Sequence, residues 1–193
     1  MKKRMILVTS PPASGKTFVS KQLAKKLPNV VYLDKDALIP LSSQIFKVVG
    51  EENNRSSAFF EEHIRNYEYI AILNIAFEAL EYSNLVLINA PFTREVRDNE
   101  YIKGLKEKLA SHNTELIVIW VETDIEVSRQ RMIKRNSPRD TWKLANWEEY
   151  IASRNYSTPD IPALSDCLVK FYNSNSTEFN ESIERITKFL LEE

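Results

Sequence analysis

The chain has one cysteine and three glycines among its 193 residues, and it has no long apolar segment. A single cysteine, Cys167, allows no disulfide within the chain and no cysteine-based zinc site. No run of about 18 apolar residues is present, so no membrane-spanning helix is expected. The basic residues 1–4 precede an apolar run that is too short for a signal peptide. These absences lead us to expect a cytoplasmic protein with a reduced thiol.

An excess of charge of either sign is also missing. Lysine and arginine total 26, aspartate and glutamate total 27, and the formal net charge is −1. A near-neutral surface does not favour nucleic acid as a partner, although a local basic groove is compatible with it. The length and the hydrophobic content of 43% suit one domain over residues 1–193.

Five apolar runs alternate along the chain with segments of helical periodicity. This alternation is typical of βα units, and near-continuous Leu, Ile and Val in a strand indicates a sheet with both faces covered. The sequence therefore predicts a three-layer α/β fold, with a five-stranded, mostly parallel sheet and helices on both faces. Active sites in such sheets lie at the carboxyl ends of the strands. The predicted strands are 5–9, 30–33, 85–89, 116–121 and 167–172.

The junction after the first strand carries the motif of a phosphate-binding P-loop, and it predicts a P-loop NTPase fold. Backbone N–H groups of Ala13, Ser14 and Gly15 are expected to bind phosphate oxygens, because the N-terminus of a helix attracts anions. Lys16 is expected to reach the β- and γ-phosphates of a nucleotide. The hydroxyl of Thr17 is expected to bind Mg²⁺.

The glycine spacing of the motif is incomplete, because Ser10 stands where the pattern has glycine. Gly15 is retained next to the lysine, where the backbone comes closest to phosphate. The helix that follows carries Val19, Leu23 and Leu27 on one face, as a helix packed on a sheet requires. The strand before the loop and the helix after it favour nucleotide binding over an ordinary turn with a solvated lysine.

Two carboxylates follow the second predicted strand, and parallel strands would bring them to the same edge as the P-loop. Phosphoryl transfer to a hydroxyl needs a carboxylate that accepts the hydroxyl proton. Asp36 or Asp34 could do this, and the other could support Mg²⁺; we assign Asp36 as the base and Asp34 to the metal. The alternative is a turn in which the aspartates only cap the next helix.

The third predicted strand ends in Asn89, where many P-loop proteins have an aspartate that supports Mg²⁺. A neutral amide lends no charge to a metal, but it could orient a metal-bound water. Arg94 and Arg97 follow, and either could contact an acidic group of a substrate. Arginines in such positions are more often solvated surface charges.

The helix after the fourth predicted strand begins with a capping box, Thr123 to Glu126. An arginine cluster follows within eleven residues. Its members are Arg129, Arg131, Arg135 and Arg139. Guanidinium groups on a mobile lid can stabilise a transferring phosphoryl group and exclude water, so residues 129–147 are predicted to form a lid. The alternative is a basic helix face exposed to solvent.

With these residues in place, the chain resembles the P-loop kinase group, within it the kinase domain of polynucleotide 5′-kinases and the gluconate- and nucleotide-type kinases. Residues 1–17 have the same form of basic start, apolar strand, proline-containing loop and Gly-Lys-Thr. Asp36 lies twenty residues after Lys16, which is the spacing of the general-base aspartate in the polynucleotide kinases. Residues 134–139 are similar to the lid of that family.

The resemblance implies a five-stranded parallel core with an arginine-bearing lid, ATP and Mg²⁺ as cofactors, and a catalytic role for Lys16. Asp36 would take the acceptor proton, and Arg135 and Arg139 would close over the phosphates. Arg131 could stack on the adenine, and the loop that begins at Asn173 could touch the edge of the base.

These motifs predict an ATP-dependent kinase that acts on a small-molecule hydroxyl or phosphate, as a monomer or homodimer. The alternatives are a polynucleotide 5′-hydroxyl kinase and a nucleotide-binding module without transfer activity. The acceptor is expected to bind to an insertion at about residues 38–82, which contains a helix of three- and four-residue apolar spacing. The apolar positions of that helix are Tyr67, Ile70, Leu73, Phe77 and Leu80.

Overall fold

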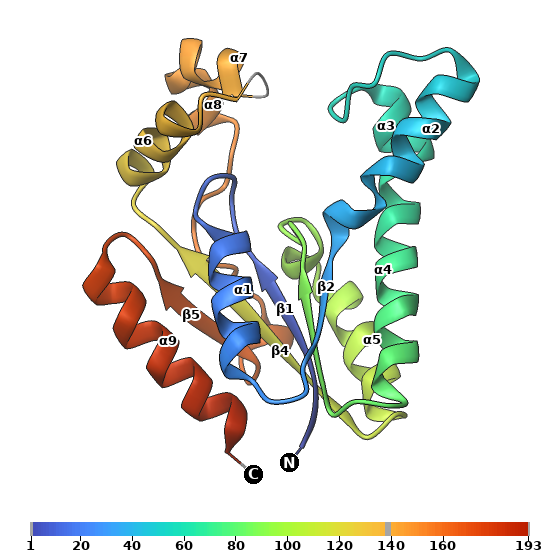
Figure 1. The fold of residues 1–193 in the computed structure, drawn as a ribbon, viewed down its shortest axis with the longest axis vertical. Coiled ribbons are helices and arrows are strands. Elements are labelled where there is room, and N and C mark those ends of the chain that lie inside the picture. Colours follow the sequence, from blue (N-terminus) through green and yellow to red (C-terminus); the bar gives the residue numbers. More distant parts are fainter. Residues whose placement is uncertain (1, 138–139, 193) are drawn as a thin grey trace.

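The computed structural model describes residues 2–137 and 140–192, and it confirms the five-stranded sheet. The strands are hydrogen-bonded in the order β2-β3-β1-β4-β5, and all four pairings are parallel. The central strand β1 has β3 and β2 on one side and β4 and β5 on the other, so the connection from β3 to β4 crosses it (Figure 1). The strands are β1 Lys3–Thr9, β2 Val31–Asp34, β3 Leu85–Asn89, β4 Thr114–Glu122 and β5 Leu168–Tyr172.

Helices cover both faces of the sheet, as predicted. The helices that cover it are α1 Lys16–Lys26, α4 Arg65–Leu80, α5 Asn99–Ala110 and α9 Ser176–Leu191. Two further groups rise above the carboxyl ends of the strands (Figure 1). They are α2 Ile39–Val49 with α3 Ala58–His63, and α6 Ile125–Arg135 with α7 Thr141–Ala145 and α8 Trp147–Ala152. Short 3₁₀ turns are η1 Lys35–Leu38, η2 Glu95–Arg97 and η4 Pro162–Leu164.

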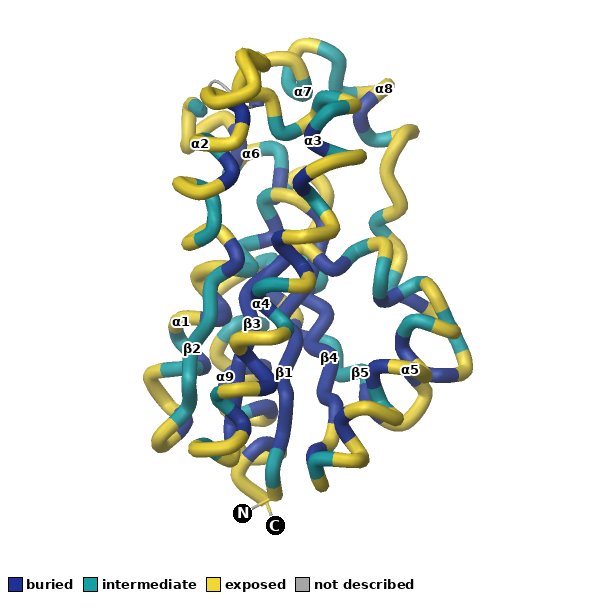
Figure 2. Tube along the Cα trace, turned by 90° about the vertical axis from the view of Figure 1, so that its right-hand side faces the viewer, coloured by how far each residue is buried: buried dark blue, intermediate teal, exposed yellow. Residues whose placement is uncertain are grey.

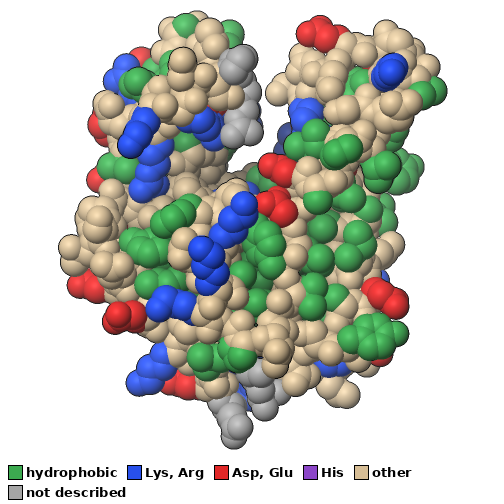
Figure 3. Space-filling model, in the orientation of Figure 1, with side chains coloured by type: hydrophobic (Ala, Val, Ile, Leu, Met, Phe, Trp, Pro, Cys, Tyr) green, Lys and Arg blue, Asp and Glu red, His purple; other side chains and the backbone are tan. Residues whose placement is uncertain are grey.

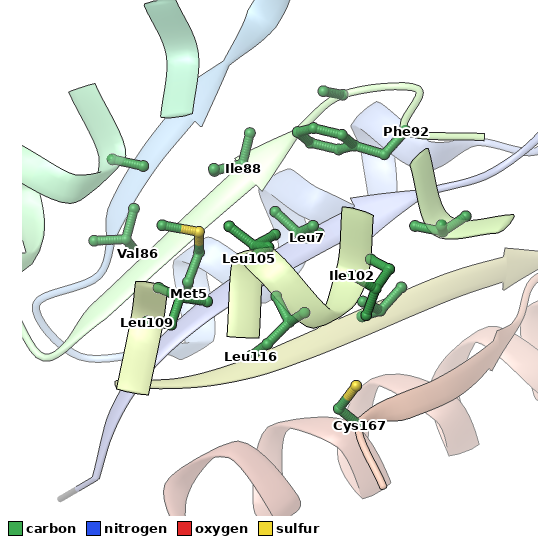
Figure 4. Packing of buried hydrophobic residues seen from close by; sticks show 14 of the residues in the cluster. Met5, Leu7, Val86, Ile88, Phe92, Ile102, Leu105, Leu109, Leu116 and Cys167 are labelled. Atoms are coloured by element: carbon green, nitrogen blue, oxygen red, sulfur yellow. The ribbon is translucent and has the colours of Figure 1, made fainter. Parts of the chain in front are cut away.

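The two faces of the sheet bury alternate residues of each strand, because side chains along a strand point to opposite sides. On β1, Met5 and Leu7 belong to the core shared with α4 and α5 (Figure 4). Ile6 and Val8 belong to the core shared with α1 and α9. The three inner strands, β1, β3 and β4, are the most continuously buried part of the chain, whereas the outer strands β2 and β5 are mostly half-buried (Figure 2). Burial of each such side chain contributes about 1.5–3 kcal/mol, and this two-sided core fixes the strand ends where the site is built.

The predicted face of one helix is confirmed and that of another is partly wrong. Helix α1 and the residue after it bury Val19, Leu23 and Leu27 as expected. On the same face of the sheet, α9 buries Ile183, Ile186 and Leu190, with Phe179 partly buried. In α4, Phe77 and Leu80 are buried, but Tyr67 and Ile70 are exposed. The buried face of α4 also carries Glu68, Tyr69, Ile72 and Ala76. The apolar spacing missed this face because a charged residue, Glu68, lies on it.

The two upper groups form separate lobes on either side of a hollow (Figure 3). The α2–α3 lobe has a small core of its own, made of Phe46, Phe60 and Ile64. The lobe opposite is made of α6, α7 and α8, and it contains the predicted lid residues that the structure describes. Within the described residues, no helix combines the length and apolar character needed to cross a bilayer.

Candidate active site

The P-loop has the backbone conformation that an anion nest requires. Ala13 and Gly15 have φ angles of 65° and 89°, in the left-handed region. At Gly15 a Cβ atom would lie 2.5 Å from Nδ2 of Asn173, so glycine is required there for space as well as conformation. Helix α1 begins at the next residue, with no side-chain cap and no acidic residue in its first turn. Its first N–H groups are therefore oriented for an anionic ligand.

Three side chains from distant segments hold the P-loop by one carbonyl oxygen. The oxygen of Ser14 accepts hydrogen bonds from Thr123 Oγ1 at 2.9 Å, Arg131 Nη1 at 2.9 Å and Asn173 Nδ2 at 2.6 Å. The hydroxyls of Ser10 and Ser14 are also hydrogen-bonded, so the serine in place of glycine is used inside the loop. The predicted capping box is wrong, because the Thr123 hydroxyl binds the P-loop. Helix α6 begins after Asp124 without a side-chain cap.

Arg131 and Asn173 lie beside the P-loop, as expected for nucleotide-site residues. Arg131 Nη2 donates to the Asn173 carbonyl at 2.7 Å, and burial lowers the pKa of the Arg131 guanidinium. Both side chains therefore brace the loop from the β5 side. Stacking of Arg131 on adenine and contact of Asn173 with the base stay predictions.

Asn89 joins the P-loop to β2. Its Oδ1 accepts a hydrogen bond from Lys16 Nζ at 2.8 Å, and its Nδ2 donates to Asp34 Oδ2 at 2.8 Å. The side chain is 2% exposed, so both contacts are shielded from water. An ionised aspartate could accept from Lys16 but could not donate to Asp34. The structure thus explains the amide at position 89, which the sequence did not: the Asn89 side chain supplies one acceptor and one donor.

Thr17 and Asp34 have donor chemistry that fits a magnesium ion. Asn89 Nδ2 lies 3.3 Å from Thr17 Oγ1 and 2.8 Å from Asp34 Oδ2, so both oxygens lie within hydrogen-bond reach of one amide group. Mg²⁺ in phosphate-transfer sites binds one or two protein oxygens and completes its shell with water and phosphate. In the part of the chain that the structure describes, no group of three His, Cys, Asp or Glu could hold a metal without a ligand. Thr17 and Asp34 supply oxygen donors of the kind that Mg²⁺ binds, and the binding of the metal stays a prediction.

The two aspartates after β2 differ in their contacts. Asp34 uses one oxygen to cap η1, accepting from the Asp36 N–H at 3.0 Å, and the other to accept from Asn89 and from the Tyr32 hydroxyl at 2.9 Å. Burial and this carboxylate raise the pKa of Tyr32, so the phenol stays a donor. Asp36 is exposed, and among the described residues its carboxylate has no hydrogen-bond or ion-pair partner. The capping role that was the alternative for both thus belongs to Asp34 alone.

A buried ionic network holds the segment between the two aspartates. Glu68 on α4 is 4% exposed and accepts from Lys35 at 2.6 Å, from Arg55 at 2.6 Å and 2.7 Å, and from Ser42 at 2.5 Å. Burial alone would raise the pKa of Glu68, but the hydrogen bonds from Arg55, Lys35 and Ser42 overcome it and lower that pKa to about 2. Lys35 is thereby fixed, and its neighbour Asp36 is positioned with it. Sequence reasoning missed this network.

A cavity of about 830 Å³ lies over the exposed carboxylate of Asp36. Its walls come from the P-loop at 10–12, from the α2–α3 lobe and α4, from the loop after β3, and from α7 and α8 with the residues after them. It therefore opens into the hollow between the two lobes (Figure 3). The predicted acceptor region and the predicted lid face each other across it.

The lid arginines are only partly placed. Arg135 is exposed at the end of α6, and its Nε and Nη2 both donate to Asp140 Oδ2, at 2.8 Å and 2.5 Å. Arg139 lies outside the described residues.

Arg94, which follows β3, lines the cavity and forms a two-point ion pair with Glu61, at 2.6 Å and 3.0 Å. Contact of any of these arginines with phosphate stays a prediction.

Comparison with known proteins agrees with this architecture. The model of a family described as an AAA domain matches residues 5–156. The chain belongs to this AAA domain family. The match spans the AAA domain from β1 through the P-loop and both lobes to the cavity wall after α8. No curated protein sequence matches the chain.

Solved structures similar to this AAA domain protein have the fold of small P-loop kinases. A Chloroflexus aurantiacus protein provisionally named a kinase is 21% identical, with a TM-score of 0.67 over 98% of this chain and 97% of that one. A gluconokinase from Sinorhizobium meliloti is 16% identical, with a TM-score of 0.54 over 97% and 95%. The APS kinase of Mycobacterium tuberculosis, in complex with AMPPNP and APS, is 16% identical, with a TM-score of 0.57 over 99% of both chains. At these low identities, the TM-scores and the coverage show a shared fold.

Proposed function

We propose that the protein is an ATP-dependent kinase, which transfers the γ-phosphoryl group to a small-molecule hydroxyl. One observation carries the proposal: of the two aspartates after β2, only Asp36 presents a carboxylate without a partner among the described residues, and it does so in a cavity that also touches the P-loop. Asp34 is engaged through both oxygens and serves the donor side. This difference supports Asp36 as the base.

On the donor side, the chain's own groups bind the triphosphate. Main-chain N–H groups around Gly15 and at the N-terminus of α1 donate hydrogen bonds to the phosphate oxygens, and Lys16, oriented by Asn89, adds an ammonium group. Thr17 and Asp34 would hold Mg²⁺. When bound, the metal supplies positive charge that stabilises the phosphate oxygens.

On the acceptor side, a hydroxyl in the cavity attacks the γ-phosphorus. The new P–O bond forms as the bond to the ADP oxygen breaks, and the hydroxyl proton passes to the Asp36 carboxylate. Closure of residues 129–147, with Arg135 and Arg139, would exclude water, which would otherwise compete as the acceptor. Bound substrates would keep the lobes closed.

The comparisons support the donor and the reaction type. The names of similar structures include a gluconokinase and a shikimate kinase, and one was solved with AMPPNP. These belong to other proteins of low identity, so the acceptor of this chain is inferred from its own cavity. Nucleotide binding is supported by the P-loop itself.

The deciding experiment follows ADP release with a panel of sugars, sugar acids, nucleosides, nucleotides, aminoglycosides and 5′-hydroxyl oligonucleotides. With the best acceptor, Asp36→Asn should lower kcat by about 10²- to 10⁴-fold, because the base is lost. The affinity for ATP, measured by calorimetry, should stay within about twofold of the wild type, since Asp36 lies on the acceptor side. Asp160→Asn, at an exposed aspartate outside the cavity, is the matched control.

Two outcomes would overturn the proposal. If Asp36→Asn keeps the wild-type rate, the base assignment fails; if no acceptor supports ADP release while ATP binds, the chain is a nucleotide-binding module without transfer activity. Efficient transfer to an oligonucleotide that falls steeply with salt concentration would instead identify a polynucleotide 5′-hydroxyl kinase.

A further inference from the structure

The cavity beside Asp36 is strongly cationic although the protein as a whole is near neutral. Seven lysine and arginine side chains line it, against two carboxylates, those of Asp36 and Glu61. The net charge of the chain is −1, so this concentration of positive charge is local. A recessed site lined by one sign of charge attracts ligands of the opposite sign.

Five of the seven cations are held by carboxylates, some of which lie behind the cavity wall. The pairs are Lys35–Glu68 and Arg55–Glu68 at 2.6 Å, Arg65–Glu95 at 2.7 Å, Arg94–Glu61 at 2.6 Å and Lys143–Asp140 at 3.1 Å. These side chains shape the wall and are largely neutralised. The other two, Arg97 and Arg154, carry the excess charge.

Arg97 follows β3 and is partly buried. Its Nη2 donates to the carbonyls of Asn155 and Ser157, at 3.3 Å and 2.6 Å, and its guanidinium lies 5.3 Å from the Trp120 ring. In residues 2–137 and 140–192 it has no carboxylate partner. A guanidinium has five N–H donors, so Nε and Nη1 keep donors for a ligand. Burial lowers the pKa of Arg97, as expected where a charge is desolvated without a counter-ion.

Arg154 lies next to the backbone that Arg97 holds. Its guanidinium is 5.8 Å from the ring of Tyr150, a buried residue that also lines the cavity. Within the described part of the chain, the guanidinium of Arg154 forms neither a hydrogen bond nor an ion pair. The two arginines come from segments more than fifty residues apart, and the contacts of Arg97 with 155 and 157 bring them to one wall.

We propose that the acceptor is an anionic small molecule, whose carboxylate or phosphate group binds between Arg97 and Arg154 while its hydroxyl lies toward Asp36. The statement that this ligand is the phosphate acceptor rests on the proposed kinase function. Guanidinium groups bind carboxylate and phosphate oxygens in pairs, so two such groups on one wall select a charged ligand. The partly buried Arg97 fixes the site, and the exposed Arg154 is free to close on the ligand.

The first test compares acceptors that differ only in charge: a sugar with its sugar acid, a sugar with its sugar phosphate, and a nucleoside with its monophosphate. One anionic member should exceed its neutral counterpart in kcat/KM by about tenfold or more, and the pair that does so distinguishes carboxylate from phosphate. Arg97→Gln and Arg154→Gln should each raise the KM for that acceptor about 10- to 100-fold and leave the KM for ATP within about twofold.

Arg185→Gln is the matched control, because Arg185 also donates to a main-chain carbonyl, that of Lys170, but lies on α9 outside the cavity. Should Arg97→Gln fail to fold, Arg154→Gln is the variant that decides the test, since Arg154 is exposed and its side chain has no hydrogen bond to another described residue. An effect on the KM for ATP alone would place the two arginines on the donor side and overturn the proposal.

A second test measures binding without turnover, so that it does not depend on the kinase function. Malonate and inorganic phosphate are titrated by calorimetry into a Lys16→Ala background, which weakens the competing anion site at the P-loop. Saturable binding of at least one anion should be lost when Arg97→Gln and Arg154→Gln are added. Saturable anion binding without phosphoryl transfer to any acceptor would refute the kinase function and support the anion site. Efficient transfer to neutral acceptors, at a rate that is unchanged in both arginine variants, would support the kinase function and refute the anion site.

Discussion

Two buried side chains each hold a lysine at the carboxyl edge of the sheet, and they do it with opposite chemistry. Asn89 is neutral and accepts from Lys16 at 2.8 Å; Glu68 is ionised and accepts from Lys35 at 2.6 Å. Asn89 is 2% exposed and Glu68 is 4% exposed, so burial is the same at both sites. The two differ in what surrounds them and in the task that the lysine has.

The neutral amide lies on the side that we propose binds the nucleotide phosphates. An amide orients the Lys16 ammonium without adding a negative charge that would repel a triphosphate. The ionic contact lies on the proposed acceptor side, where Lys35 and Arg55 converge on one carboxylate and tie η1, the α2–α3 lobe and α4 together. On the proposed donor side a lysine is thus held by a neutral amide, whereas the proposed acceptor wall is held by buried ion pairs.

Of the substitutions that test this comparison, Glu68→Gln should have the largest effect on the free energy of unfolding. Loss of the carboxylate leaves Lys35 and Arg55 buried or partly buried without their counter-ion, and such a loss typically costs about 3–5 kcal/mol of unfolding free energy. Urea unfolding followed by circular dichroism measures the difference. Glu78→Gln, at an exposed position on the same helix, should change the free energy of unfolding by less than about 0.5 kcal/mol.

The pH dependence of that difference is a separate check. The pKa of Glu68 is about 2 in the folded protein, below its ordinary value of 4.5, so the carboxylate contributes stability above pH 4.5. The contribution should be lost as the pH falls from 4.5 toward 2. The free-energy gap between the wild type and Glu68→Gln should therefore narrow over this window, and a gap that is independent of pH would contradict the ionised network.

The opposite change is Asn89→Asp, which adds a charge to the neutral site. A carboxylate there would meet Asp34 across a distance now 2.8 Å and would lose the donated hydrogen bond. We expect a loss of about 1–3 kcal/mol in unfolding free energy with EDTA present, partly recovered with Mg²⁺. Asn180→Asp, at an exposed position on α9, is the control. An unchanged stability in EDTA would show that the donor side is not preset by this amide.

The last comparison uses two glycines, and the second of them, Gly104, has the smallest expected effect. Gly15→Ala should cost about 1–3 kcal/mol, because φ is 89° and the new Cβ would lie 2.5 Å from Asn173 Nδ2. It should also abolish measurable ATP binding in calorimetry. Gly104→Ala, in α5 with no atom within 4 Å of the new Cβ, should instead raise the stability by about 0.5–1 kcal/mol. Equal changes in stability at both sites would show that the loop conformation at Gly15 does not require glycine.

Particular elements show where sequence reasoning succeeded. The five strands were predictable because continuous Leu, Ile and Val can be buried on both faces only in a covered sheet. The P-loop was predictable because its chemistry is local: a loop of a few residues supplies its own N–H groups and its own lysine. The capping box at Thr123 failed for the opposite reason. Its hydroxyl found a partner, the Ser14 carbonyl, 109 residues away.

The sequence by itself determined the α/β class, the place of the phosphate loop and the two aspartates that follow β2. Only the tertiary structure decided that Asp34 is engaged while Asp36 lies open to the cavity, and that Arg97 and Arg154 share one wall. The physical reason is the range of the interactions. Backbone propensity and apolar spacing act between near neighbours, whereas a carboxylate's partners and a cavity's charge are set by segments that meet only after the sheet has formed.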